Sequence, residues 1–246
     1  MTAKNVEILG IPFIHTTQAD FIRQLLQDSL EHKKRFVVTA NPEIVMNTRS
    51  DADFKQIVLK ADYITPDGVG IIMAAKRQGS PLPERVTGFD TMQGVLKEAS
   101  HHGLKVYFLG AKPEVNEALK EKLKNSFPKL TVAGCRHGYF NLKESAEIAQ
   151  EIKASNADFI FVALGSPAQE KWIMSHFSMF EKGIFMGVGG SFDILSGTIK
   201  RAPKIIIKLR IEWIYRFVTN PSRWRRFFAI PQFMRAVNRE NKRVRK

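Results

Sequence analysis

Short runs of β-branched and aromatic residues alternate along this chain with longer segments in which apolar residues recur every three or four positions. Turn residues separate the two kinds of segment. Parallel strands need a crossover between them, so this alternation is typical of a parallel sheet covered by helices. Strands are predicted at residues 6–9, 35–39, 63–65, 105–109, 131–133, 159–164 and 184–188, and helices at 18–31, 90–100, 115–127, 145–155 and 169–177.

We therefore expect an α/β fold, with a single Rossmann-like, doubly wound, mostly parallel sheet and a helical, basic C-terminal appendage. The charge distribution sets the boundary. Of the formal net charge of +14, residues 1–198 account for little, since they have 23 Lys and Arg against 22 Asp and Glu. Residues 199–246 have 15 Lys and Arg against two Glu. The α/β domain is thus predicted to cover 1–198 and the appendage 199–246.

A basic appendage favours a polyanionic surface, either an anionic membrane or nucleic acid. The predicted helix from residue 204 has an apolar row that includes Ile207, Ile211 and Ile214. Charged residues interrupt it, so no run approaches the ~20 apolar residues of a membrane-spanning helix. Farther on, aromatic residues alternate with arginines, as suits a headgroup layer. The rest of the chain has no nucleic-acid-binding module, so we expect the membrane and rank nucleic acid second.

The single cysteine, Cys135, excludes an intramolecular disulfide, and the N-terminus has no signal-peptide pattern. We therefore expect a cytoplasmic protein that is peripheral on the inner face of the cell membrane. The oligomeric state, including a homo-oligomer, stays open.

Ligands of doubly wound sheets bind outside the carboxyl ends of the strands, so the residues after each predicted strand are the candidates for chemistry. Gly110 and Gly165 each begin a loop that reaches a proline two or three residues later, and these loops contain Lys112 and Ser166. Backbone N–H groups in front of a helix N-terminus would cradle a diphosphate. The same residues also serve simply to turn a strand into a helix, and both interpretations remain.

Asp67, in a Pro-Asp-Gly turn at a strand end, is the candidate general base, although aspartate is also a common turn former. Asp193 and Asp90 are its competitors, and Asp90 is predicted to be an N-cap. Ser166 and Gln169 match a capping box, which favours a structural role for Gln169.

Asp51 and Asp53 have the Asp-x-Asp spacing of metal-dependent sugar transferases, but their position between two helical patterns predicts that Ser50 and Asp51 are N-caps. The six histidines have no metal-ligand spacing. We expect no metal and no cofactor. The chain also lacks a P-loop, a nucleophile elbow and a dinucleotide-binding glycine turn.

Taken together, the strand-end motifs resemble the WecG/TagA/CpsF family of glycosyltransferases. They run in one order through nearly the whole chain: TANPE at 39–43, TPDGVG at 65–70, RVTGFD at 85–90, GSPAQEK at 165–171, GVGGSFD at 187–193 and KRAP at 200–203. The chain looks most like the teichoic-acid branch. That branch transfers N-acetylmannosamine from a UDP carrier to N-acetylglucosaminyl-diphospho-undecaprenol with inversion to a β-linkage.

The resemblance implies a UDP-sugar donor and an undecaprenyl-diphosphate-linked acceptor. It implies that Asp67 is the base, that Thr39 and Asn41 lie beside it, and that Gln169 is an active-site residue after all. The cationic residues implied to offset diphosphate charge are Arg85, Arg216, Arg223 and Arg226. Substrate contacts are also expected from Gly110, Lys112, Gly165, Ser166, Gly190 and Asp193. The alternatives are transfer of N-acetylmannosaminuronic acid or another UDP-linked sugar, a non-catalytic membrane scaffold, and a nucleic-acid-binding protein.

Overall fold

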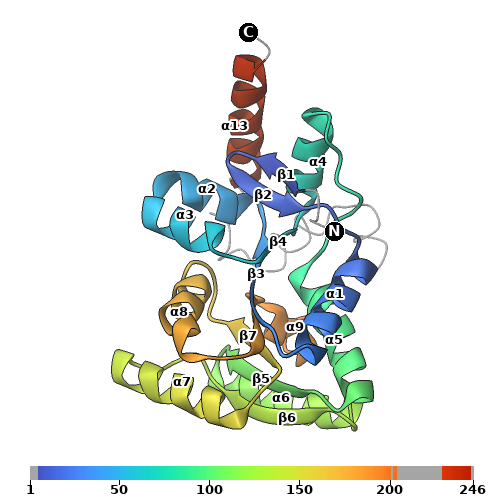
Figure 1. Cartoon of the computed structure of the whole chain (residues 1–246), viewed down its shortest axis with the longest axis vertical. Coiled ribbons are helices and arrows are strands. Elements are labelled where there is room, and N and C mark those ends of the chain that lie inside the picture. Colours follow the sequence, from blue (N-terminus) through green and yellow to red (C-terminus); the bar gives the residue numbers. More distant parts are fainter. Residues whose placement is uncertain (1–4, 201, 204–228, 245–246) are drawn as a thin grey trace.

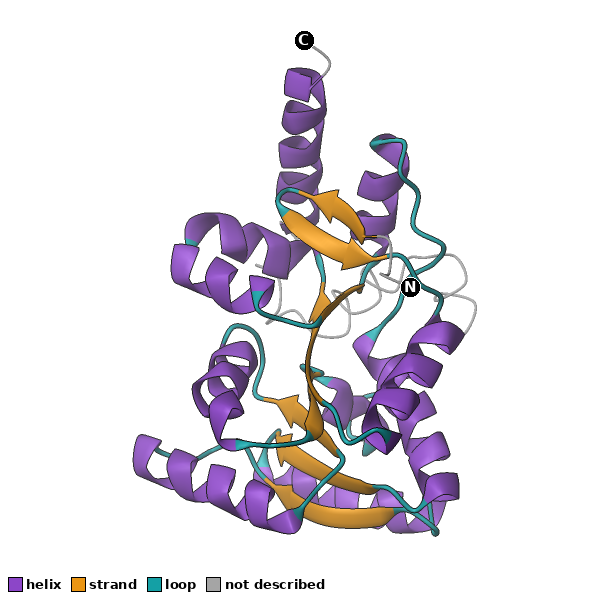
Figure 2. Ribbon diagram, in the orientation of Figure 1, coloured by secondary structure: helices purple, strands orange, loops and turns teal. Residues whose placement is uncertain are grey.

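The computed structural model describes residues 5–200, 202–203 and 229–244, and a six-stranded sheet runs through its centre (Figures 1 and 2). Its strands are β3 (Lys34–Ala40), β4 (Tyr63–Pro66), β5 (Lys105–Gly110), β6 (Thr131–Arg136), β7 (Phe159–Ala163) and β8 (Gly183–Gly187). They lie in the order β4-β3-β8-β7-β5-β6, and every neighbouring pair is parallel. The predicted parallel sheet is confirmed.

Successive strand residues point to opposite sides of this sheet, so both faces carry apolar side chains and both are covered by helices. Val37 packs in one apolar core and Val38 in the other, and Phe108 and Leu109 divide in the same way. The helices are α1 (Gln18–Leu30), α2 (Pro42–Ser50), α3 (Ala52–Leu59), α4 (Val69–Arg77), α5 (Gly88–His102), α6 (Pro113–Ser126), α7 (Leu142–Ser155), α8 (Ala168–His176), the 3₁₀ turn η1 (Phe177–Met179), α9 (Ser191–Leu195) and α13 (Ala229–Val244). Helices α1, α5, α6 and α9 contribute to one core, and α2, α3, α4, α7, α8 and α13 to the other. The doubly wound fold is therefore confirmed.

The first predicted strand does form, but not in the large sheet. It is β1 (Asn5–Ile8), which pairs antiparallel with β2 (Ile11–Ile14) in a separate hairpin. Leu9 and Gly10 have φ values of 52° and 77°, the paired positive values of a tight hairpin turn. Leucine lacks the turn signal of Asn or Asp at this position, so the sequence did not predict β2.

Helix α13 packs against α2 and α4, where Phe233 and Val237 are fully buried. Asn238 of α13 also accepts a hydrogen bond from Arg77 of α4 at 3.0 Å. Helix α13 is thus joined to the body through apolar contacts, and the boundary at residue 198 stays a prediction. Across residues 5–200, 202–203 and 229–244, no helix is both long enough and apolar enough to cross a membrane.

Of the N-caps predicted at Ser50, Asp51 and Asp90, the structure confirms only Asp51. Asp51 caps α3 by accepting from Phe54 N at 2.8 Å, as predicted, but Ser50 is the last residue of α2 and donates to Asn47 O. The prediction that Asp90 is an N-cap is wrong. Helix α5 begins two residues earlier at Gly88, so Thr87 is its cap and hydrogen bonds with Asp90 in both directions.

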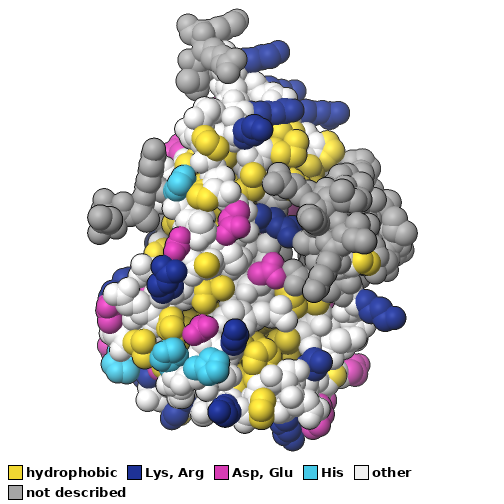
Figure 3. Space-filling model, turned by 90° about the vertical axis from the view of Figure 1, so that its right-hand side faces the viewer, with side chains coloured by type: hydrophobic (Ala, Val, Ile, Leu, Met, Phe, Trp, Pro, Cys, Tyr) yellow, Lys and Arg dark blue, Asp and Glu magenta, His cyan; other side chains and the backbone are white. Residues whose placement is uncertain are grey.

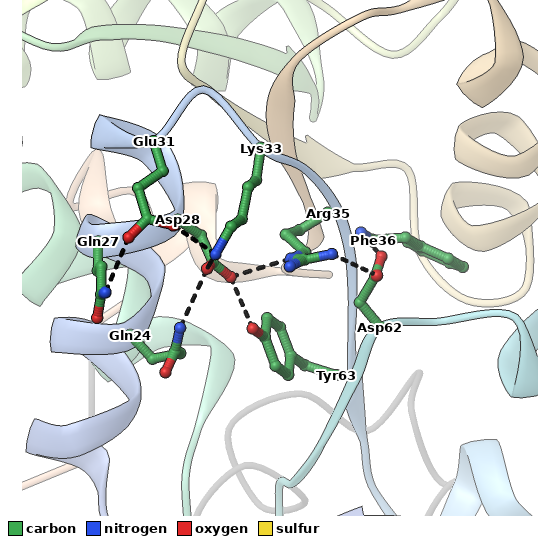
Figure 4. Close-up of polar contacts among 9 residues, drawn as sticks. All are labelled: Gln24, Gln27, Asp28, Glu31, Lys33, Arg35, Phe36, Asp62 and Tyr63. Carbon is green, nitrogen blue, oxygen red and sulfur yellow. Dashed lines mark hydrogen bonds and ion pairs between the residues drawn. The ribbon is translucent and has the colours of Figure 1, made fainter. Parts of the chain in front are cut away.

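A buried carboxylate of α1 forms hydrogen bonds to side chains of β3 and β4 (Figure 4). Asp28 is fully buried and accepts hydrogen bonds from Tyr63 Oη at 2.6 Å, Arg35 Nε at 3.0 Å and Lys33 Nζ at 3.2 Å. Burial raises the pKa of Asp28, but these hydrogen bonds and the charge of Arg35 outweigh it and bring the pKa below its ordinary value. The carboxylate therefore stabilises the fold at neutral pH.

Replacing Asp28 with alanine is expected to lower the free energy of unfolding by about 3 kcal/mol, the lower end of the range for a broken buried ion pair, because Arg35 stays partly exposed. Urea unfolding at pH 7 measures the effect. Because the folded pKa is lowered, the difference between wild type and variant shrinks as pH falls through that value. The control is Glu117→Ala, which breaks an exposed pair with Lys120 and should cost about 0.5 kcal/mol or less. Equal losses in both variants would contradict a special role for Asp28.

Candidate active site

A cavity of about 580 Å³ lies at the carboxyl ends of the sheet strands. Its lining comes from the segments that follow β3, β4, β5, β6, β7 and β8, together with the first residues of α13. Parallel strands bring their carboxyl ends to one edge, which is why segments so distant in sequence meet here. The volume is in the range of small-ligand sites.

Most residues singled out in the sequence line this cavity. They are Thr39, Asn41, Asp67, Arg85, Lys112, Gly165, Ser166, Gln169, Gly190 and Asp193. Gly110 does not line it. Arg216, Arg223 and Arg226 lie outside the described residues.

Asp67 lies half-buried in the turn after β4, where its carboxylate meets the start of α5. Its Oδ2 accepts a hydrogen bond from the backbone N–H of Gly88, the first residue of that helix, at 3.1 Å. The partial positive charge of a helix N-terminus favours the ionised carboxylate. The Asp67 backbone N–H donates to Ala40 O at 3.0 Å, which holds the turn against the end of β3.

Thr39 and Gly88 are packed side by side next to this carboxylate. A Cβ on Gly88 would lie 3.1 Å from Thr39 Oγ1, a distance that would force one of the two to move. The Thr39 hydroxyl also donates to Gly187 O at 2.9 Å, across to β8. Glycine at position 88 therefore leaves room for the Thr39 side chain where the ends of β3 and β4 meet the start of α5.

Gln169 is only 3% exposed and connects α8 to the loop after β8. Its Nε2 donates to Glu170 Oε1 at 2.8 Å, and its Oε1 accepts from Gly189 N at 3.0 Å. The predicted capping box is wrong, because α8 begins at Ala168 with Pro167 as its cap residue and no side chain caps it. The Gln169 amide thus bonds to the loop after β8 instead of to the backbone at the start of its own helix.

The two glycine loops that look alike in sequence differ in structure. Gly110 has a φ of 131°, and a Cβ there would lie 2.4 Å from Ala163 O in the neighbouring strand. Its role is close backbone packing. Gly165, with a φ of 79° and open space around its Cβ position, lines the cavity. Pro113 is the first residue of α6, whereas Pro167 precedes the first residue of α8.

Tyr139 was missed by sequence reasoning. It is 64% exposed at the cavity wall, next to Gly138, whose N–H donates to Ala111 O at 2.8 Å. Strand β6 extends to Arg136, three residues beyond its predicted end, so the following loop was not counted among the strand ends. Ala229 and Ile230 of α13 also line the cavity.

In the described part of the chain, no three or more His, Cys, Asp or Glu side chains group together as a metal site. Asp51 is engaged as a cap and pairs with Lys171 at 3.4 Å, and neither Asp51 nor Asp53 lines the cavity. The expected independence of metal stays a prediction.

The fold and the cavity define an α/β protein with a ligand site at the carboxyl edge of a parallel sheet. A sequence model described as the glycosyl transferase WecG/TagA/CpsF family matches residues 6–246. The chain belongs to this family.

Three similar proteins carry the name N-acetylglucosaminyldiphosphoundecaprenol N-acetyl-beta-D-mannosaminyltransferase. The protein of Bacillus spizizenii is 39% identical over 92% of this chain and 88% of its own length. That of Bacillus subtilis is 34% identical over 96% and 91%, and that of Staphylococcus aureus 38% identical over 100% and 96%.

Replacing Gly110 with alanine is expected to destabilise the fold by about 2–3 kcal/mol, since the new Cβ meets a backbone carbonyl and the φ is unfavourable for alanine. Thermal or urea unfolding measures this. Lys112→Ala, two residues away and exposed, is the control and should change stability by about 0.5 kcal/mol at most. Wild-type stability in Gly110→Ala would show that the glycine is not required for strand packing.

Proposed function

We propose that this chain transfers N-acetylmannosamine from a UDP carrier to N-acetylglucosaminyl-diphospho-undecaprenol. The family membership and the shared name of the three relatives support this reaction over transfer of a uronic acid and over nucleic-acid binding. The observation that carries the proposal is the position of Asp67, a carboxylate that lines a ligand-sized cavity and is held at the start of α5.

The lining of the cavity suits a nucleoside diphosphate. Lys112 and Arg85 supply positive charge, and Lys112 directly precedes the first residue of α6, where backbone N–H groups and the helix dipole favour phosphate. Tyr139 offers an exposed aromatic face on which a nucleobase can stack. Gly165 has no side chain, so its backbone itself lines the cavity. Asp193 provides a carboxylate that can accept hydrogen bonds from sugar hydroxyls.

In the proposed reaction, Asp67 takes the proton of the acceptor hydroxyl as its oxygen attacks the anomeric carbon of the donor. The bond between that carbon and the diphosphate oxygen breaks, and UDP leaves with the electron pair. One displacement inverts the configuration and forms no covalent sugar–enzyme intermediate. Arg85 and Lys112 offset the charge that develops on the leaving group, and Thr39 and Asn41 position the sugars.

Replacing Asp67 with asparagine is expected to lower kcat by about 10²–10⁴-fold, because the isosteric amide cannot accept the proton. The affinity for UDP, measured by calorimetry, should stay close to that of the wild type. Transfer is followed with a short-chain lipid acceptor in the presence of a chelator, which should not reduce the rate if cationic side chains alone neutralise the diphosphate.

The matched control is Asp193→Asn, a second carboxylate of the same cavity, which should weaken substrate binding without abolishing turnover. Loss of turnover in Asp193→Asn, together with normal turnover in Asp67→Asn, would show that Asp193 and not Asp67 is the general base.

We also propose that the end of the molecule bearing α13 faces the anionic inner surface of the cell membrane. A second hollow, of about 690 Å³, is lined by four basic residues, Arg49, Lys55, Arg235 and Arg239, and by Glu7 and Glu240; we refer to it as the basic groove. Figure 3 shows Lys and Arg side chains projecting from the protruding α13 end. Since the same helix begins at the cavity, roughly 15 Å along its axis separates the cavity wall from Arg239. This spacing suits an acceptor whose lipid chain stays in the bilayer.

Neutralising Arg235 and Arg239 together with glutamine is expected to weaken binding to vesicles containing anionic lipid about thirtyfold, at about 1 kcal/mol for each charge. Sedimentation with vesicles measures the partitioning, and UDP affinity should not change. The control replaces Lys120 and Lys124 of α6, at the opposite end of the molecule in Figure 1. An equal loss in the control would mean that net charge, and not this face, governs binding.

A further inference from the structure

Glu170 is a fully buried carboxyl group that the proposed chemistry does not use. It lies in the first turn of α8, directly after Gln169, and is 0% exposed. Its Oε1 accepts the 2.8 Å hydrogen bond from Gln169 Nε2. Its Oε2 is also buried and makes no well-formed hydrogen bond within the part of the chain that the structure describes. A carboxyl group in such surroundings is costly to bury, so its contact with Gln169 is the feature to explain.

The surroundings of Glu170 act on its charge in both directions. Burial raises its pKa above the ordinary value, and the negative charge of Glu43 at the cavity wall adds to this. The hydrogen bond from Gln169, its own backbone N–H and the nearby Ser166 hydroxyl oppose the rise in pKa. The net effect is a raised pKa for Glu170, and Gln169 is the side chain that does most to limit that rise.

Glu170 and Gly189 together specify which way the Gln169 amide faces. The two ends of an amide are nearly identical in shape, so hydrogen-bond partners decide its orientation. At one end, Glu170 Oε1 accepts from the amide nitrogen; at the other end, the Gly189 N–H can only donate and takes the amide oxygen. A flipped amide would place two acceptors together at Glu170 and two donors together at Gly189. Only one orientation satisfies both partners.

This orientation anchors a segment that lines the cavity. Gln169 holds Gly189, while Thr39 holds the carbonyl of Gly187 two residues earlier. The segment between these anchors continues into Gly190 and Asp193, which line the cavity. Gln169 itself lines the cavity, and its Nε2 has a second N–H beyond the one given to Glu170.

We propose that Glu170 is a positioning residue for sugar transfer, which fixes the Gln169 amide and, through it, the loop between β8 and α9. The inference rests on the proposed function, because it assigns Glu170 an effect on turnover at the same site. It adds a residue that touches no substrate and acts entirely through its neighbour.

Glu170→Gln tests this with little change of volume. The new amide can either donate or accept, so it no longer specifies one orientation of Gln169. We expect kcat to fall at least tenfold, while the UDP dissociation constant stays within about threefold and the melting temperature stays near that of the wild type. A purely structural role would lower the melting temperature and leave the turnover of the folded enzyme unchanged.

A double-mutant cycle with Gln169→Ala makes the test specific, because coupled residues are non-additive. Once the amide is gone there is nothing to orient, so adding Glu170→Gln to Gln169→Ala should change kcat less than twofold. Wild-type turnover in Glu170→Gln, or effects of the two substitutions that multiply, would overturn the proposal.

Gly187→Ala displaces the same amide directly and is the alternative test if Glu170→Gln does not fold. Its Cβ would lie 2.6 Å from Gln169 Nε2, so the amide must move while Glu170 stays intact. The same loss of kcat supports the proposal, and full activity overturns it. The wild-type enzyme in each assay separates the two claims. An inactive wild type would overturn the proposed function and the inference with it, whereas an active wild type with an equally active variant overturns only the role of Glu170.

Discussion

The contact on which the site depends is the hydrogen bond between the Asp67 carboxylate and the backbone N–H that begins α5. It joins the end of β4 to a helix that packs on the other side of the sheet from α4. Residue 88 is glycine and so leaves room for the Thr39 side chain beside this contact. A carboxylate is thereby held half-buried at a helix N-terminus, a position that favours its ionised form while leaving it at the cavity wall.

The start of α4, directly after the Asp67 turn, connects the cavity to α13. Gly70, three residues after Asp67, packs so closely on Pro42 that a Cβ would lie 2.8 Å from its ring, and the next neighbour is Phe233 of α13 at 3.8 Å. Helix α13 therefore packs on the start of the helix that follows Asp67, while its first residues line the cavity and its basic residues line the basic groove. Membrane contact and catalysis would share one helix in this arrangement.

Features that depend on strand periodicity were predictable from the sequence. Val37 and Val38 belong to opposite cores, as a strand buried on both faces requires, and the strand ends pointed to Asp67, whereas Thr39 and Gln169 became candidates through the family resemblance. Features that depend on tertiary contacts were not. The local pattern of Ser166 and Gln169 matches a capping box, yet Gly189, distant in sequence, provides the partner that the amide takes. Tyr139 was hidden because β6 continues past its predicted end.

The most direct measurement is a crystal structure with UDP and an acceptor analogue whose lipid is shortened. The account predicts the diphosphate beside Lys112 and Arg85, and the acceptor hydroxyl within hydrogen-bonding distance of the Asp67 carboxylate, about 2.6–3.2 Å. A complex with UDP bound outside this cavity, or with the acceptor hydroxyl facing a different carboxylate, would contradict it.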